Sequence, residues 1–277
     1  MNHAKTVGPV AASCEQRILS KSPPPKLLVS VRNAAEARTA LQAGCDVLDV
    51  KEPARGALGM ADIAAIAEIV AQSREFASPV PVSVALGDAV EWTPDRPLPK
   101  LPGGIAFLKV GTAGSDRCAA WEASFGALLR RFETESNCSI GDAAIASSLP
   151  VAGGFAPSWI AVAYADWQTA RGPAPDDVIA AASECGCTGV LIDTFSKGRL
   201  RLFDWLDSSR LASLAEQARS LRLTFAVAGR LQIGDLLQVL AVGPDIVGIR
   251  SAACRDGIRS GAIDAAAVRA FGEALRK

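Results

Sequence analysis

Histidine is nearly absent from this chain of 277 residues. The single histidine, His3, lies in an N-terminal segment with no helical or strand pattern. Ser-His-Asp triads, histidine metal cages and histidine general bases are therefore excluded. Any chemistry that the protein performs must depend on lysine, arginine, aspartate and glutamate.

Net charge and paired cysteines are missing as well. Lysine and arginine total 29, and aspartate and glutamate also total 29, so no net field favours nucleic acid or a membrane surface. The seven cysteines are scattered, and Cys185 and Cys187 form a C-x-C pair without a second pair, so no metal site is expected. Unpaired cysteines of this kind fit a reducing, cytoplasmic compartment.

Long apolar runs are the third absence. No uninterrupted stretch approaches the roughly 20 residues that a membrane-spanning helix needs, and no signal-peptide pattern opens the chain. We therefore expect a cytoplasmic protein with no membrane and no nucleic-acid partner. The apolar fraction of 49% and a long insert at Ser136–Pro157 suggest a homo-oligomer.

Strand-like and helix-like segments alternate along most of the chain. Residues 1–25 end in a Ser-Pro-Pro-Pro run and predict a disordered N-terminal tail, whereas residues 26–277 read as one catalytic domain. The expected strands are Leu27–Val31, Asp46–Lys51, Val80–Leu86, Ile105–Val110, Trp159–Tyr164, Gly189–Asp193, Leu223–Ala228 and Ile246–Arg250. The expected helices are Ala34–Ala43, Ala61–Gln72, Ala119–Glu135, Asp176–Glu184, Ser208–Ser220, Ile233–Ala241 and Ala265–Arg276.

This alternation predicts an α/β fold with a parallel sheet covered by helices. Seven of the eight strands are followed by a helix, and the third is followed by a proline-rich connection, Trp92–Gly104. Eight such units match a single (β/α)8 TIM barrel. A doubly wound open sheet is the other possibility, but no G-x-G-x-x-G follows any strand.

The segment Cys45–Gly59, read CDVLDVKEPARGALG, carries the strongest chemical signal. Asp49 and Lys51 are two positions apart on an expected buried strand, so their side chains share one face. A buried charge is costly unless it is paired. The pair is equally compatible with a salt bridge that closes the strand and with a catalytic lysine.

Lys109 repeats this pattern on the fourth strand, and Asp193 ends the sixth, with Lys197 four residues later. Barrel sites lie at the carboxyl ends of the strands, so these charges are expected to converge. A second cation and desolvation lower the pKa of a lysine, and a neutral amine can form a Schiff base with a carbonyl. The alternative is a ring of ion pairs that stabilises the barrel.

The last two strands end in residues suited to phosphate. Gly229, Arg250 and Ser251 are the expected phosphate-binding residues, because barrels often bind phosphate at this position. The alternative is an ordinary turn. Arg255, Arg259 and the loop Asp256–Gly261 are interpreted as a solvated face. Tyr164, the only tyrosine, is compatible with a site role and with a core role.

Several stretches resemble the (5-formylfuran-3-yl)methyl phosphate synthase family, barrel enzymes of methanofuran-type cofactor biosynthesis for one-carbon metabolism. They cover most of residues 27–254 in the family's order. The stretches are LLVSVRNAAEA, AGCDVLDVKEPARGALG, VSVALGD, FLKVG, VAYADW, CGCTGVLIDTFSKG, LFDWL, AVAG and DIVGIRSAAC. The insert Ser136–Pro157 falls outside the resemblance.

The resemblance implies a lyase that joins two molecules of glyceraldehyde 3-phosphate into the phosphorylated furan, without metal or cofactor. By position, Lys51 would form the Schiff base and Lys109 would accept and donate protons. Asp49, Asp193 and Lys197 match supporting positions. A generic class I aldolase or triose-phosphate isomerase-like barrel, and a non-catalytic barrel that binds a phosphorylated metabolite, are the alternatives.

Overall fold

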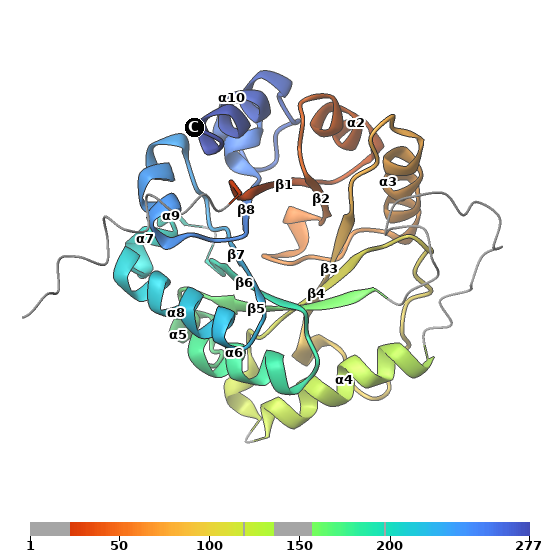
Figure 1. Ribbon diagram of the computed structural model, residues 1–277. Coiled ribbons are helices and arrows are strands. Elements are labelled where there is room, and N and C mark those ends of the chain that lie inside the picture. Colours follow the sequence, from red (N-terminus) through yellow and green to blue (C-terminus); the bar gives the residue numbers. More distant parts are fainter. Residues whose placement is uncertain (1–22, 119, 136–156, 197) are drawn as a thin grey trace, which may run out of the picture.

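Eight parallel strands close into a barrel in chain order, as the alternating pattern predicts (Figure 1). The computed structural model describes residues 23–118, 120–135, 157–196 and 198–277. The strands are β1 (Lys26–Val31), β2 (Val47–Val50), β3 (Val82–Asp88), β4 (Phe107–Gly111), β5 (Ser158–Tyr164), β6 (Gly189–Asp193), β7 (Thr224–Val227) and β8 (Ile246–Ile249). The fold is thus a (β/α)8 TIM barrel, and the open-sheet alternative is excluded.

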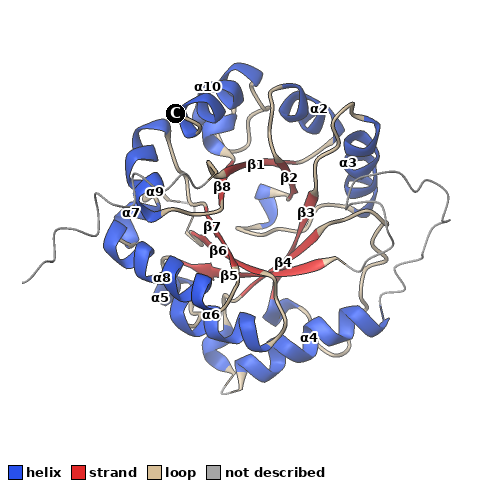
Figure 2. Cartoon of the chain, in the orientation of Figure 1, coloured by secondary structure: helices blue, strands red, loops and turns tan. Residues whose placement is uncertain are grey.

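The helices form an outer ring around the strands (Figure 2). The long ones are α2 (Ala34–Gln42), α3 (Ile63–Glu75), α4 (Trp121–Glu135), α6 (Pro175–Glu184), α8 (Ser208–Ser220), α9 (Leu236–Val242) and α10 (Ala265–Leu275). Two short helices, α5 (Trp167–Ala170) and α7 (Leu202–Trp205), were not expected. A 3-10 turn, Ala89–Glu91, precedes the proline-rich connection Trp92–Gly104, and the described residues of that connection form no helix or strand.

Two predicted segments fall largely beyond the described residues. Residues 1–22 of the expected tail and 136–156 of the insert are outside them, while Pro23–Pro25 precede β1 without regular structure. Among the residues that the structure describes, no helix is long and apolar enough to cross a bilayer.

The strands divide the protein interior into an outer part, between the strands and the helices, and an inner part, inside the barrel. On β1, Leu27, Val29 and Val31 are fully buried in the outer part, a large apolar cluster shared with the surrounding helices. The alternate residues Leu28 and Ser30 line the barrel interior. Because side chains alternate along a strand, polar residues can face inward while the outer face stays apolar.

The barrel interior is unusually open. Side chains from eight strands ordinarily fill a barrel of this kind. Here the small residues Ala226, Ala228 and Gly248 of β7, its following loop and β8 line the interior, together with Thr224 and Ile246, and a cavity of about 1100 Å³ remains. The cavity extends through the barrel, from Pro23–Pro25 and α9 residues such as Leu240 at the amino-terminal end to Lys51 beyond the end of β2. The fold therefore provides room for a ligand beside the charged strand ends.

Candidate active site

Strands β2, β4 and β6 bring two lysines and two aspartates into the cavity. Asp49, Lys51, Lys109 and Asp193 all line it, and each is at most 5% exposed. The parallel register aligns Asp49 with Ser30 on β1 and with Ser83 on β3. The alternation of side chains seen in the sequence thus becomes a charged cluster at the carboxyl ends of the strands.

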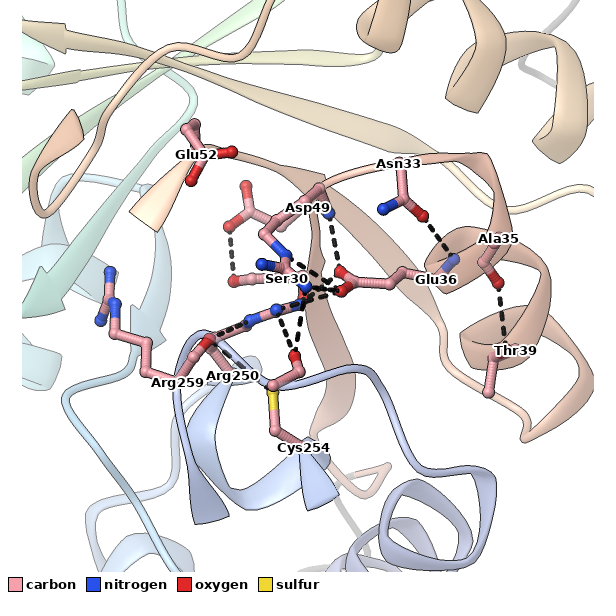
Figure 3. Close-up of polar contacts among 12 residues, drawn as sticks. Ser30, Asn33, Ala35, Glu36, Thr39, Asp49, Glu52, Arg250, Cys254 and Arg259 are labelled. Atoms are coloured by element: carbon pink, nitrogen blue, oxygen red, sulfur yellow. Dashed lines mark hydrogen bonds and ion pairs between the residues drawn. The ribbon is translucent and has the colours of Figure 1, made fainter. Parts of the chain in front are cut away.

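Asp49 connects the two lysines. One carboxylate oxygen, Oδ1, forms an ion pair with Lys109 Nζ, and the other, Oδ2, lies 3.9 Å from Lys51 Nζ. Lys51 Nζ also lies 3.9 Å from Asp193 Oδ2. Ser30 donates a hydrogen bond of 2.9 Å to Asp49 Oδ2, which fixes the carboxylate (Figure 3). Lys51 therefore sits between two carboxylates with a second ammonium group close by.

Burial sets the protonation of this cluster. Desolvation lowers the pKa of Lys51 to about 8, with Lys109 and Arg259 acting in the same direction and Asp193 and Asp49 opposing them. Burial acts to raise the pKa of Asp49, yet the charges of Lys109 and Lys51 outweigh it, and the pKa is lowered. At neutral pH the site thus holds an ionised carboxylate and a lysine that releases its proton readily.

The loop after β6 is fixed by a buried carboxylate. Asp166 is fully buried and accepts hydrogen bonds from the backbone N–H groups of Phe195 (2.7 Å) and Ser196 (2.8 Å). Asp193 in turn accepts 2.7 Å from the Thr194 N–H. Lys197, one of the predicted supporting residues, lies outside the described residues. Asp166 is thus a positioning residue for the loop that follows Asp193.

Replacing Asp166 with asparagine should weaken this loop. Asparagine keeps one acceptor and loses the charge, so the free energy of unfolding should fall by about 1–3 kcal/mol. Denaturant unfolding measures this change, and hydrogen exchange at Phe195 and Ser196 localises it. Asp95→Asn, on an exposed loop, is the matched control. Unchanged protection at both amides would show that Asp166 does not hold the loop.

All five N–H groups of Arg250 donate hydrogen bonds to other residues of the protein. Nη1 donates to Glu36 Oε2 (2.6 Å) and to the Ser30 carbonyl (3.0 Å), and Nη2 donates to Glu36 Oε1 (3.2 Å) and to the Gly261 carbonyl (2.8 Å). Nε donates to the Arg259 carbonyl (2.9 Å) (Figure 3). An arginine has no further donors. In this arrangement Arg250 joins β8 to the start of α2 rather than offering a free fork to a phosphate.

The other two predicted phosphate residues lie on the cavity wall. Gly229 has φ of +109°, a conformation that favours glycine, and an added Cβ would meet Thr194 Cγ2 at 3.0 Å. Ser251 begins a 3-10 turn, Ser251–Ala253, beside the cavity. Their role in phosphate binding stays a prediction.

Arg259 does not belong to a solvated face, so that interpretation was wrong. The segment after β8 folds back on itself, with Arg255 N–H bonded to the Ala262 carbonyl and Cys254 bridged to Ile263. This fold-back directs Arg259 to the cavity, while Arg255 is exposed as expected. A sequence signal for this was not available, because nothing local predicts the fold-back.

Tyr164 is buried at the end of β5, the strand next to β4, which carries Lys109. Its hydroxyl donates 2.8 Å to Asp88 Oδ1, and its ring meets Phe195 edge to face. Burial raises the pKa of Tyr164 well above its ordinary value, and Asp88 acts in the same direction. Gly111 packs against this pair so closely that a Cβ would collide with both partners. Tyr164 therefore belongs to the core beneath the loops.

The fold and these side chains define a (β/α)8 barrel with a lysine and carboxylate cluster at the carboxyl ends of its strands. Solved barrels share this fold at low sequence identity. The 3-hexulose-6-phosphate synthase of Salmonella typhimurium aligns with a TM-score of 0.52 at 14% identity, over 90% of this chain and 98% of that one. Such a likeness shows the fold alone.

Sequence relatives specify the family. A family model described as 4-HFC-P synthase matches residues 27–272, and the chain belongs to this family. The (5-formylfuran-3-yl)methyl phosphate synthase of Methanopyrus kandleri is 33% identical over 91% of this chain and 99% of that protein. The protein of the same name from Methanothermobacter thermautotrophicus is 30% identical over 90% and 98%. The family is one of synthases, so the protein is an enzyme.

Proposed function

We propose that this protein is a (5-formylfuran-3-yl)methyl phosphate synthase that joins two molecules of glyceraldehyde 3-phosphate through a Schiff base on Lys51. The observation that carries the proposal is the position of Lys51, buried between Asp49 and Asp193 with its pKa lowered to about 8. The names of the relatives supply the product, and the amine of Lys51 faces a cavity that a small phosphorylated substrate can enter.

The first part of the mechanism is imine formation. The neutral amine of Lys51 attacks the carbonyl carbon of one triose phosphate, and the carbinolamine loses water to give the imine. The imine withdraws electrons, so a proton can leave the neighbouring carbon and an enamine forms. We assign this proton to Lys109, which lines the same cavity as Lys51 and is connected to it through the carboxylate of Asp49.

Carbon–carbon bond formation and elimination complete the reaction. The enamine carbon attacks the carbonyl of the second triose, and proton transfers through Lys109 accompany the step. One phosphate and two molecules of water leave in total, which balances two trioses against the furan aldehyde phosphate without any oxidant. Asp193 stabilises the iminium charge on Lys51, together with Asp49.

A product assay with purified protein tests the proposal. Incubation with glyceraldehyde 3-phosphate should release inorganic phosphate together with a furan chromophore, and borohydride should trap a triose adduct on Lys51. A sugar bisphosphate with no phosphate release would identify an aldolase instead. Binding with neither product nor adduct would identify a non-catalytic barrel and exclude the synthase.

The rate of imine formation should depend on pH through Lys51. The amine is the nucleophile, so the rate should rise about tenfold per pH unit at low pH and level off above about 8. The ordinary pKa of lysine, 10.5, would instead put the midpoint more than two units higher. Rapid-quench trapping with borohydride between pH 6 and 10 measures the profile. A midpoint near the ordinary value would contradict the role of burial.

A further inference from the structure

Two arginines at the cavity mouth have unsatisfied donors. Arg230 follows β7 and Arg259 follows β8, and both line the cavity. In each, the Nε–H group is buried without a hydrogen-bond partner among the described residues. Arg259 has one long contact, 3.4 Å from Nη2 to the Ala57 carbonyl. A buried donor without a partner is costly, which points to an acceptor that arrives with a ligand.

The charges around these arginines also point to an anion. No carboxylate of the described residues forms an ion pair with either guanidinium. Burial lowers the pKa of Arg259, and the nearby charges of Arg250 and Arg230 lower it further, although Asp193 and Asp49 oppose them. Like charges that face one cavity repel each other unless a negative group lies between them. A ligand anion would supply it.

The backbone holds both side chains in place. Arg230 has φ of +58°, a left-handed conformation that is strained for a residue with a side chain, directly after Gly229. The buried Arg250 fixes the backbone of Arg259 by donating to its carbonyl. Figure 3 shows the Arg259 side chain pointing away from the Arg250 and Glu36 contacts. The two guanidinium groups, each with an unsatisfied Nε–H, are therefore presented by restrained loops.

We propose that Arg230 and Arg259 together bind the phosphate monoester of the substrate whose carbonyl reacts with Lys51. The planar guanidinium fork matches phosphate oxygens, and two forks satisfy a dianion. Arg230, Arg259 and Lys51 line the same cavity, so one short ligand can contact the arginines with its phosphate and Lys51 with its carbonyl carbon. The identity of the ligand as a triose phosphate rests on the proposed function, whereas the affinity for phosphate does not.

Comparing aldehydes with and without phosphate tests this site. The concentration of glyceraldehyde 3-phosphate needed for half-maximal borohydride trapping should rise about tenfold to hundredfold in Arg259→Met and in Arg230→Met. Arg259→Lys keeps the charge and loses the planar fork, so its half-maximal concentration should lie between those of the wild type and Arg259→Met. Trapping by unphosphorylated glyceraldehyde should change less than about twofold, because it makes no phosphate contact. Arg255→Met, on the exposed part of the same loop, is the control.

Calorimetry with inorganic phosphate gives a second readout that needs no turnover. The wild-type protein should bind phosphate, and both methionine variants should lose that binding while near-ultraviolet circular dichroism stays unchanged. The inference would be overturned if trapping by glyceraldehyde 3-phosphate and trapping by glyceraldehyde weakened equally in the variants. It would also be overturned if phosphate binding survived in both variants. If phosphate binding is lost as expected but the wild type makes no furan, the proposed function fails and the phosphate site stands.

Discussion

Replacing Lys51 with arginine is expected to abolish furan formation and borohydride trapping together. Arginine keeps a positive charge between Asp49 and Asp193, but its guanidinium does not lose a proton and forms no imine. The loss in turnover should be on the order of 10⁴-fold or more, as for other covalent enzymes deprived of their nucleophile. Mass spectrometry of the trapped protein and a furan absorbance assay measure the two effects.

Lys109→Arg is the matched control for this variant, since it places the same change on the other side of Asp49. It should still be trapped at Lys51 by borohydride, while turnover falls by about 10²- to 10⁴-fold through the loss of proton transfer. Lys100→Arg, on an exposed loop, should change neither. Trapping in Lys51→Arg together with loss of trapping in Lys109→Arg would reverse the two roles.

Replacing Asp49 with asparagine should have the second largest effect, on stability as well as on activity. Asparagine leaves Lys51 and Lys109 buried without the carboxylate that connects them, and breaking a buried pair in this way costs about 3–5 kcal/mol. Without Asp49 the pKa of Lys51 should also move further below 8, because one of the two carboxylates that raise it is gone. Chemical denaturation and the pH profile of trapping measure the two changes.

The pH dependence of this defect has a definite sign. A lysine whose pKa is lowered in the folded state is penalised at low pH, and the penalty disappears as pH rises and the group loses its proton. Relative to the wild type, Asp49→Asn should therefore regain stability as pH rises from the lowered pKa of Lys51 in the variant to about 8, its wild-type value, and the difference should stay constant above that pH. A pH-independent defect in Asp49→Asn would argue against the uncompensated lysines.

Ser30→Ala removes only the hydrogen bond to Asp49 Oδ2, so it should lower the free energy of unfolding by about 1 kcal/mol.

The sequence was sufficient where the structure depends on local periodicity. Asp49 and Lys51 are two residues apart on one strand, and alternation alone places them on the same face. Lys109 and Asp193 follow from the same rule, once eight strands are assigned to a barrel whose carboxyl ends meet. The proximity of these four residues was therefore predictable, although their distances and the shared carboxylate were not.

The contacts of the arginines that follow β8 were harder to predict, because they depend on distant parts of the chain. The sequence suggests Arg250 as an anion ligand, whereas in the structure its guanidinium pairs with Glu36, which lies 214 residues earlier in the chain. The sequence suggests that Arg259 is solvated, whereas in the structure the segment after β8 folds back and directs Arg259 to the cavity. The open interior was also unpredictable, since it reflects how Ala226, Ala228 and Gly248 coincide on neighbouring strands.

The contact between Arg250 and Glu36 has a consequence for how the protein is made. β1 pairs with β8, and Arg250 also binds the carbonyl of Ser30, which is 220 residues away. During synthesis the chain emerges from its N-terminus, so β1 and Lys51 are made long before β8, the strand that pairs with the other edge of β1. Closure of contacts so distant in sequence is slow, and it must come last. A nascent chain that lacks β8 therefore has an open barrel edge for most of its translation, a period in which chaperones would be expected to bind it.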